Sequence, residues 1–161
     1  MKRMPEEIRE WISYNPQTGD MTWLKSKGKA RAGATVGTIN LHGYVQMRFN
    51  GVIYRGHRVA YWLHHGVEPD VVDHINEVKS DNRITNLQSL TDNENRQLTR
   101  IRSGTHGVCW CVDKTHKAGG FYRATWGTEI AYQGTSKHLA RAARTAKEQE
   151  WLSDNPHIRM E

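Results

Sequence analysis

The sequence predicts an α+β fold made of small antiparallel sheets and separate helices. Asn50 and Gly51 separate two runs of β-branched and aromatic residues, and both residue types tolerate the positive φ of a tight hairpin turn. A second set of such runs lies between residues 104 and 134, and Ser136 after it can cap a long helix. Strands are therefore expected in two regions of the chain, each accompanied by a helix.

The N-terminal region is predicted to form an antiparallel sheet between two short helices. Pro5 favours a helix start, and Ile8 and Ile12 fall on one face of that helix. Gly66 can stop a second helix. We expect the basic segment 25–31 to be a loop. The predicted elements are a helix over 5–12, strands over 21–24, 36–39, 44–49 and 52–54, and a helix over 57–65.

Two more groups of strands and helices are predicted further along the chain. Residues 87–90 fit a short strand, and Thr91 with Glu94 has the spacing of a capping box that opens a helix. The apolar positions of the last helix approximate a face that can cover a sheet. In the C-terminal region the predicted elements are strands over 108–112, 122–126 and 130–133 and a helix over 136–152.

These elements divide the chain into four parts. Residues 1–56 form a β-rich segment, 57–100 a central unit, 101–105 a linker and 106–161 a module of sheet plus helix. The two cysteines, Cys109 and Cys111, stand in a C-x-C pattern without a second pair. They therefore provide neither a zinc quartet nor a disulfide framework.

The charge of the chain is positive and unevenly distributed. The net charge of +6 and the pI near 9.5 indicate a polyanionic partner, either a nucleic acid or an acidic membrane surface. Residues 21–67 contain seven Lys and Arg and no acid, 68–94 contain seven acids and two bases, and 114–147 contain seven bases and one acid. Basic regions around an acidic centre fit a protein that grips phosphates and holds a cation.

Hydropathy argues against a membrane partner. No apolar run approaches membrane-spanning length, and the N-terminus lacks the apolar core of a secretory signal. We therefore expect a soluble protein of the cytoplasm.

Asp73 and His74 are the strongest candidates for chemistry. They follow the apolar pair Val71-Val72, and adjacent side chains at a strand end point to opposite sides. One can bind a metal while the other addresses a water molecule, as metal-assisted phosphodiester hydrolysis requires. Two carboxamides, Asn86 and Asn95, follow, and Asn95 falls in the first turns of the next predicted helix. A strand, a loop, a second strand and a helix would bring these residues together.

This combination resembles the HNH endonucleases, whose catalytic unit is a ββα-metal (His-Me finger) nuclease core. The motif reads Asp73-His74-Ile75-Asn76, then Asp81-Asn82-Arg83 with Asn86-Leu87, and a trailing Asn95. Upstream, Tyr14-x-Pro16-x-Thr18-Gly19 and His57-Arg58-Val59-Ala60 are similar to leader segments of phage and homing HNH nucleases. The resemblance covers about residues 14–100, and it departs from the namesake pattern in having Asn95 at the third position instead of a histidine.

The resemblance implies a role for each of these residues. His74 would be the general base, and Asn86 would hold the loop and orient the His74 ring. Asp73 and Asn95 would bind one Mg²⁺ or Mn²⁺ ion per active site, because a set of carboxylate and carboxamide oxygens favours hard cations over zinc. The implied reaction is metal-dependent hydrolysis of DNA to 5′-phosphate and 3′-hydroxyl ends. A monomer with one site would nick, and no obligatory protein partner is evident; a phage-borne gene would place it in the host cytoplasm.

Basic residues on both sides of this centre are candidate contacts for double-stranded DNA. They are Lys25, Lys27, Lys29, Arg31, Arg48 and Arg55 along a loop and strands, and Arg83, Arg96, Arg100 and Arg102 near the proposed site. On Gly107-Val108-x-Trp110 and Phe121-Tyr122-Arg123-Ala124, the C-terminal module resembles the DNA-binding domain of ethylene-response transcription factors. That resemblance, over about residues 104–152, implies contacts from Lys114, Lys117, Arg123 and Trp126, with Trp110 either a contact or part of the core.

Other interpretations stay open. Asn86 can be purely structural, and we expect His57, His64 and His65 to pack or to contact phosphates, because their spacing does not suit a metal. A non-catalytic DNA-binding or regulatory protein that retains a nuclease fold would bind DNA without cutting it. RNA cleavage would use the same residues.

Overall fold

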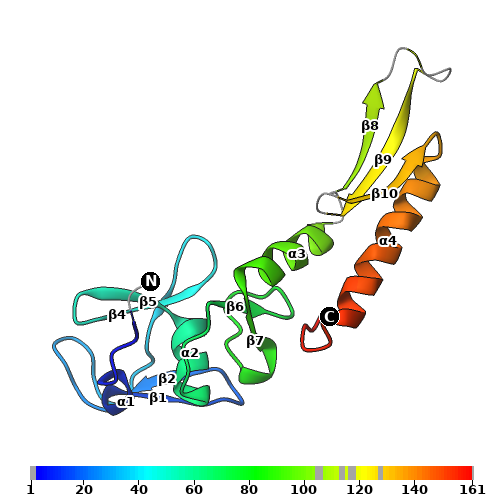
Figure 1. The fold of residues 1–161 in the computed structure, drawn as a ribbon. Coiled ribbons are helices and arrows are strands. Elements are labelled where there is room, and N and C mark those ends of the chain that lie inside the picture. The colour runs from blue at the N-terminus through cyan, green and yellow to red at the C-terminus, as the bar shows by residue number, and fades with distance from the viewer. Residues whose placement is uncertain (1–2, 104–106, 113–114, 116–118, 127–128, 161) are drawn as a thin grey trace. The chain divides into compact units, whose positions relative to one another are not determined.

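The computed structural model describes residues 3–103, 107–112, 115, 119–126 and 129–160, and it has the predicted α+β fold of small sheets and helices (Figure 1). The chain forms two compact units. Unit 1 contains Met1–Asn95 together with Arg159–Glu161, and unit 2 contains Arg96–Ile158. Unit 1 therefore consists of two stretches of chain that are separated in sequence by the whole of unit 2.

Unit 1 is built from narrow antiparallel sheets and short helices. The strand β1 pairs with β2. The strands β3, β4 and β5 form one sheet in that order, and β6 pairs with β7. Its elements are α1 (Ile8–Trp11), β1 (Ile12–Tyr14), β2 (Met21–Trp23), β3 (Thr38–Ile39), β4 (Val45–Phe49), β5 (Val52–Arg55), α2 (Gly56–His65), β6 (Val71–His74), the 3₁₀ turn η1 (Ile84–Asn86), β7 (Leu87–Leu90) and the start of α3 (Asp92–Ser103).

The predicted hairpin and the predicted end of α2 are confirmed. Asn50 and Gly51 connect β4 to β5 with φ values of 48° and 79°. Gly66 ends α2 with a φ of 76°, and its N–H donates to the Trp62 carbonyl. The first helix is shorter than predicted, because Ile12 has an extended φ of −131° and begins β1.

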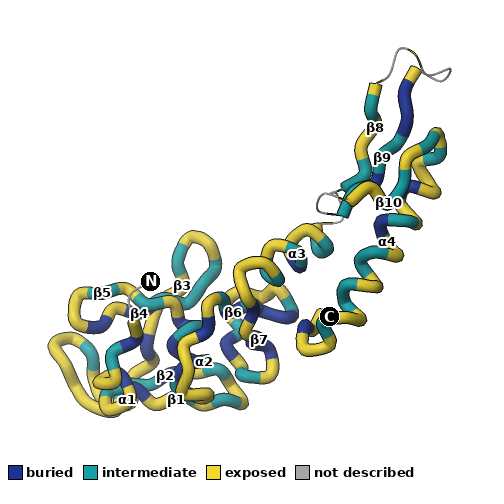
Figure 2. The backbone as a smooth tube through the Cα atoms, viewed as in Figure 1, coloured by how far each residue is buried: buried dark blue, intermediate teal, exposed yellow. Residues whose placement is uncertain are grey.

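The largest apolar core of unit 1 lies among its first sheets and α2 (Figure 2). Ile8, Phe49 and Val59 are at most 2% exposed. Trp11 and Trp23 flank Phe49 at ring-centroid distances of 6.4 and 6.5 Å. Burial of these large side chains is the main source of stability for sheets this narrow.

A second apolar cluster fastens α2 to the pair of strands β6 and β7. It contains Ala60, Val72 and Leu87, with exposed fractions of 0%, 7% and 2%. The start of α2 also lies against β4, since a Cβ on Gly56 would come within 2.9 Å of the Val45 Cβ. These contacts bring the first turn of α2 to the end of β6.

Unit 2 contains the three-stranded sheet and the helix that the sequence predicts. Its strands are β8 (Val108–Val112), β9 (Gly120–Trp126) and β10 (Glu129–Gly134), and its long helix is α4 (Lys137–Asp154). The strands pair antiparallel in the order β10-β9-β8, and α4 packs on β9 and β10. The Ser136 hydroxyl accepts a hydrogen bond from the Leu139 N–H at 3.2 Å, which confirms the predicted cap.

The helix α3 extends into the predicted linker. It continues to Ser103 and so includes the first three residues of the segment 101–105, while residues 104–106 lie outside the described part. None of the described helices has both the length and the apolar character that crossing a bilayer requires.

Candidate active site

The paired strands β6 and β7 present Asp73 and His74 side by side. In the antiparallel register Asp73 lies opposite Gln88, and His74 lies opposite Leu87. Because successive side chains of a strand alternate, the two residues point to opposite faces of the pair. His74 is only 5% exposed, whereas Asp73 is half-buried.

The His74 imidazole is surrounded by side chains from three other segments. Its Nε2 lies 3.3 Å from Oδ1 of Asn82, which is itself 3% exposed. The rings of His57 and Tyr44 lie 5.0 and 6.0 Å from the His74 ring, centroid to centroid. An amide oxygen only accepts, so Nε2 donates in this contact when it carries the ring proton.

Asn86 closes the loop between β6 and β7. Its Oδ1 accepts from the Asn76 N–H at 2.9 Å, and its Nδ2 donates to the Asp81 carbonyl at 2.8 Å. The prediction that Asn86 holds the loop fits these bonds. The His74 ring, however, contacts Oδ1 of Asn82. Asn86 therefore makes the bonds that hold the loop, and Asn82 makes the contact that orients the ring.

Asp81 stabilises the same loop electrostatically. Its carboxylate accepts from Nε and Nη2 of Arg83 and from Nδ2 of Asn76. The hydrogen bonds from Arg83, chiefly, lower the pKa of Asp81 to about 2. Part of the Arg83 guanidinium, which was predicted to contact DNA, is therefore engaged with Asp81 within the loop.

The N-terminal turn over 15–20 supports this loop from behind. The Tyr14 hydroxyl donates to the Asn82 carbonyl at 2.7 Å, and the Ile84 N–H donates to the Pro16 carbonyl at 3.0 Å. Burial, with a smaller contribution from the negative charge of Asp81, raises the pKa of Tyr14 to about 12. The leader motif that begins at Tyr14 thus has a structural task, which is to position the backbone beside Asn82.

His57 lies in the first turn of α2 as a packing residue. It is 8% exposed, and its ring lies 5.3 Å from that of Tyr44. Its Nδ1 is buried and finds no hydrogen-bond partner among the described residues. Burial is the first cause that lowers the pKa of His57 to about 3, followed by the proximity of His74 and of Arg58 and Arg55. His57 is therefore neutral at physiological pH.

The Asp73 carboxylate is oriented by an amide across the strand pair. Gln88 Nε2 donates to Asp73 Oδ2 at 2.8 Å. Asn95 lies half-buried in the first turn of α3. The predicted capping box starts this helix: the Thr91 N–H donates to Glu94 Oε2 at 2.7 Å, and the Glu94 N–H donates to Thr91 Oγ1 at 3.2 Å. Glu94 is thus a capping group, as expected.

The donor chemistry near Asp73 fits a hydrated hard cation. Within the described ranges, no three His, Cys, Asp or Glu side chains gather into a metal-binding group. The resemblance to HNH nucleases assigns a cation to the Asp73 carboxylate and the Asn95 carboxamide, and water or phosphate would supply the remaining oxygens. Mg²⁺ accepts such a coordination because it retains several of its waters.

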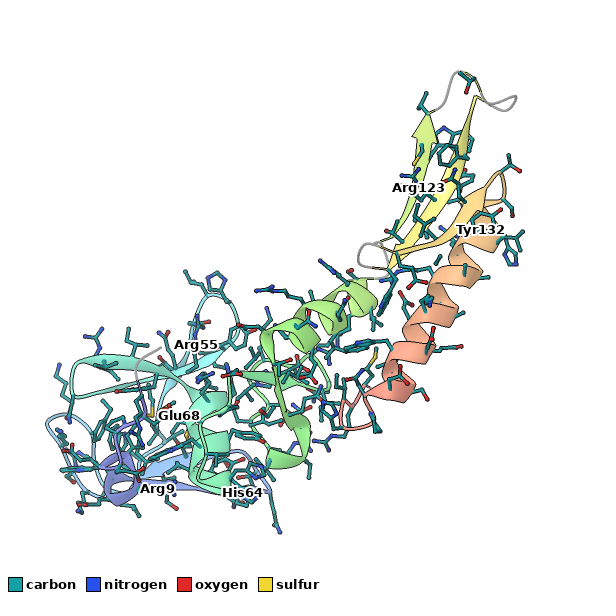
Figure 3. All side chains as sticks on the ribbon, in the orientation of Figure 1. Arg9, Arg55, His64, Glu68, Arg123 and Tyr132 are labelled. Atoms are coloured by element: carbon teal, nitrogen blue, oxygen red, sulfur yellow. The ribbon has the colours of Figure 1, made fainter. Side chains whose placement is uncertain are left out.

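The predicted basic contacts of unit 1 have unequal surroundings. Lys25 pairs with Glu10 at 3.4 Å, and the Lys27 ammonium lies 4.9 Å from the centroids of the Trp11 and Phe49 rings. Arg55, labelled in Figure 3, lies 5.1 Å from the ring of Tyr44, a neighbour of His74. Lys29, Arg31 and Arg48 are exposed, and in the part of the chain that the structure describes they have neither an ion pair nor an aromatic ring beneath the charge.

In unit 2, Arg123 and Trp126 lie on opposite faces of β9. The Arg123 guanidinium donates to Gln133 Oε1 at 3.3 Å on the partly open face, where Figure 3 labels it. Trp126 packs against the helix α4 instead, with its ring 6.2 Å from Trp151 and 4.2 Å from the Arg144 guanidinium. Trp126 is half-buried there, and its predicted contact with DNA stays a prediction.

The remaining candidates of unit 2 have simpler positions. Arg96 and Arg100 are exposed along α3, and Arg102 is half-buried. Lys114 and Lys117 lie outside the described residues. Trp110 is 44% exposed and packs edge-on against Tyr122 at 4.7 Å.

Comparison with protein families identifies the class to which the site is similar. Residues 54–97 match the family model described as HNH endonuclease. The matched stretch runs from β5 into α3 and contains Asp73, His74, Asn86 and Asn95. This part of the chain is therefore similar to HNH endonucleases, which supports nuclease activity on DNA. Comparisons with curated proteins and with solved structures found no match. The resemblance of residues 104–152 to ethylene-response factors stays a prediction.

Proposed function

We propose that this protein is an HNH-type endonuclease that hydrolyses phosphodiester bonds in double-stranded DNA with one Mg²⁺ or Mn²⁺ ion. The observation that carries the proposal is the pair Asp73 and His74 at the end of β6, with the imidazole fixed by Asn82. The match of residues 54–97 to the HNH endonuclease family supports the same reaction class.

The chain's own residues divide the chemistry among them. The His74 imidazole accepts a proton from the attacking water, and the contact with Asn82 holds the ring. Asp73 and Asn95 hold the cation, which when bound neutralises charge that develops on the phosphate and on the leaving oxygen. The water oxygen bonds to phosphorus as the bond between phosphorus and the 3′ oxygen breaks, and the 3′ oxygen takes a proton from solvent, which leaves 5′-phosphate and 3′-hydroxyl ends.

The substrate is held by basic side chains of both units. In unit 1 the exposed Lys29, Arg31 and Arg48 contact phosphates, and in unit 2 Arg123 contacts DNA from the partly open sheet face. With one such site per chain, the protein acts as a monomer and nicks one strand in each event.

A plasmid-nicking assay tests the proposal. Purified protein is incubated with supercoiled plasmid and Mg²⁺ or Mn²⁺, and the open-circular and linear products are followed. We expect nicking that EDTA abolishes and that His74→Ala reduces by at least about 100-fold, since a general base contributes roughly 10²–10⁴-fold. His64→Ala, which removes an exposed histidine of α2, is the matched control and keeps full activity.

Two other outcomes would point elsewhere. Tight DNA binding without metal-dependent cleavage would identify a DNA-binding regulator that keeps a nuclease fold. Preferential cleavage of structured RNA in competition with duplex DNA would reassign the substrate.

A further inference from the structure

Gln88 is a buried amide at the centre of a hydrogen-bond network beside Asp73. It is 4% exposed, and its side-chain amide bonds to Asp73 and Arg159. Its Nε2 donates to Asp73 Oδ2 at 2.8 Å and to the Arg159 carbonyl at 3.0 Å. Its Oε1 accepts from the Arg159 N–H at 2.7 Å. Both ends of the amide are thus engaged, which fixes its orientation as well as its position.

Arg159 reaches this network from far along the chain. It lies 71 residues after Gln88, yet it belongs to the same compact unit. Its guanidinium donates to the carbonyls of Thr85 and Leu87 at 3.3 and 3.2 Å, on either side of the point where η1 meets β7. The backbone of Arg159 pairs with the Gln88 amide as a neighbouring strand would, and its side chain anchors it there.

We infer that Gln88, clamped by the backbone of Arg159, is a positioning residue that orients the Asp73 carboxylate for the catalytic cation. The inference rests on the proposed function. It adds two residues that the resemblance to HNH nucleases did not indicate, and it makes the segment after unit 2 part of the nuclease site.

The chemistry of a carboxylate ligand explains why such a clamp matters. A donor on Oδ2 fixes the plane of the carboxylate and directs a lone pair of Oδ1 toward a cation in one-oxygen coordination. A freely rotating Asp73 would lose conformational entropy on binding the ion, and second-shell partners of this kind change metal affinity by about 10–100-fold. Because Gln88 is buried, no water can easily replace its amide there.

Mn²⁺ binding by the full chain tests the inference directly. Free Mn²⁺ is measured by its electron paramagnetic resonance signal during titration of protein, without DNA cleavage as the readout. Gln88→Met keeps the size of the side chain but removes the amide, and we expect it to weaken Mn²⁺ binding by about 10-fold or more. Ser89→Ala, an exposed neighbour on β7, is the matched control and keeps wild-type affinity.

A pair of substitutions at residue 159 separates the backbone clamp from the side chain. Arg159→Pro removes the backbone N–H that donates to Gln88 Oε1. Arg159→Ala keeps this N–H and removes only the guanidinium. We expect Arg159→Pro to weaken Mn²⁺ binding several-fold more than Arg159→Ala. This pair also preserves the test if Gln88→Met does not fold.

The outcomes distinguish this inference from the proposed function. Wild-type protein that neither binds Mn²⁺ nor nicks plasmid would overturn both. Wild-type protein that does both, with Gln88→Met and Arg159→Pro binding Mn²⁺ as tightly as wild type, would overturn the role of Gln88 and leave the nuclease assignment intact.

Discussion

The His57 and His74 rings lie 5.0 Å apart, so a proton on one raises the cost of charging the other. Burial is the larger cause at His57 and, together with the proximity of His74, lowers its pKa to about 3. The neutral His57 ring packs against the His74 imidazole and limits its movement, and it does not compete for the proton of His74.

Replacement of His57 is expected to change the pH dependence of stability. The unfolded chain protonates this residue at its ordinary pKa of 6.5, whereas the folded chain does so only near 3. Folding stability is therefore lost as the pH falls below 6.5, by about 2 kcal/mol at about pH 5 from this group. The free energy of unfolding is measured in urea at about pH 7.5 and about pH 5. The difference between the two values should be about 2 kcal/mol smaller in His57→Phe than in wild type.

The exposed His64 provides the comparison for this measurement. His64→Phe keeps the buried imidazole and should retain the wild-type difference between the two pH values. Equal pH dependence in wild type and His57→Phe would show that His57 is not kept neutral by the fold.

Asn82 should be needed for cleavage. Asn82→Ala removes the contact between the amide oxygen and the His74 Nε2 and leaves room for the ring to turn. We expect the nicking rate to fall by about 10-fold or more, in line with the loss of other second-shell partners. Asn93→Ala, an exposed asparagine of α3, should nick at the wild-type rate, and the same rate in both variants would remove Asn82 from the mechanism.

The sequence singled out the candidate residues Asp73 and His74, but it did not predict the contacts that surround them. Asp73 and His74 follow from an apolar run and a motif, but the division of labour between Asn82 and Asn86 depends on how a loop turns back on itself. Both are asparagines in the same motif, and only the fold shows which one meets the ring. The role of Gln88 was not predicted, because no local signal in the sequence indicates its partner, Arg159.

At the scale of elements, the turn over 15–20 and the loop that carries Asn82 form one packed layer. Gly19 has a φ of 81°, and a Cβ at this position would lie 2.7 Å from the Arg83 nitrogen and the Asn82 carbonyl carbon. Backbone atoms cannot yield as the end of a flexible side chain can. The turn and the loop are therefore matched in shape at the glycine.

Gly19→Ala is expected to destabilise unit 1 and to disturb the site. Its positive φ alone costs about 1 kcal/mol, and the contact with the loop backbone adds to this cost. Gly33→Ala separates the two effects, because Gly33 has a φ of 82° but no atom within 4 Å of its Cβ position. Thermal unfolding should show the larger loss for Gly19→Ala, and equal losses would mean that the loop adapts to the methyl group.

The elements that were predicted well have strong local signals. The Asn50-Gly51 turn, the Gly66 end of α2, the Thr91 capping box and the Ser136 cap each depend on a few adjacent residues. The strand β1 lacks such a signal, since its first residue, Ile12, also fits the apolar face of the helix before it. The linker was predicted to begin at residue 101, whereas α3 continues to Ser103, because Ile101 and Arg102 are compatible with a helix.

At the scale of the whole molecule, the net charge of +6 says less about contacts with DNA than the surroundings of each charged side chain do. Several cations serve the fold: Arg83 pairs with Asp81, Lys27 lies over aromatic rings, and Lys147 pairs with Glu129 and Glu150. The cations that face solvent without an ion pair are better candidates for phosphate contacts.

The salt dependence of DNA binding should reflect this difference. Each phosphate contact contributes about 0.9 to the slope of log K against log salt concentration. The double variant Lys29→Gln, Arg31→Gln should lower the slope by up to about 2. Lys147→Gln, which removes an ion-paired lysine, should leave it unchanged in fluorescence-anisotropy titrations, and an equal loss in both would show that local pairing does not select the contacts.

The return of Arg159 to unit 1 sets an order for biosynthesis. The ribosome makes every residue of the catalytic motif well before it reaches Arg159. Translation of the intervening 63 residues takes roughly 3 to 13 s at about 5–20 residues per second. During that interval the nascent chain carries Asp73 and His74 without the clamp on Gln88. The proposed metal site therefore gains its support from Arg159 only after the whole of unit 2 has been translated.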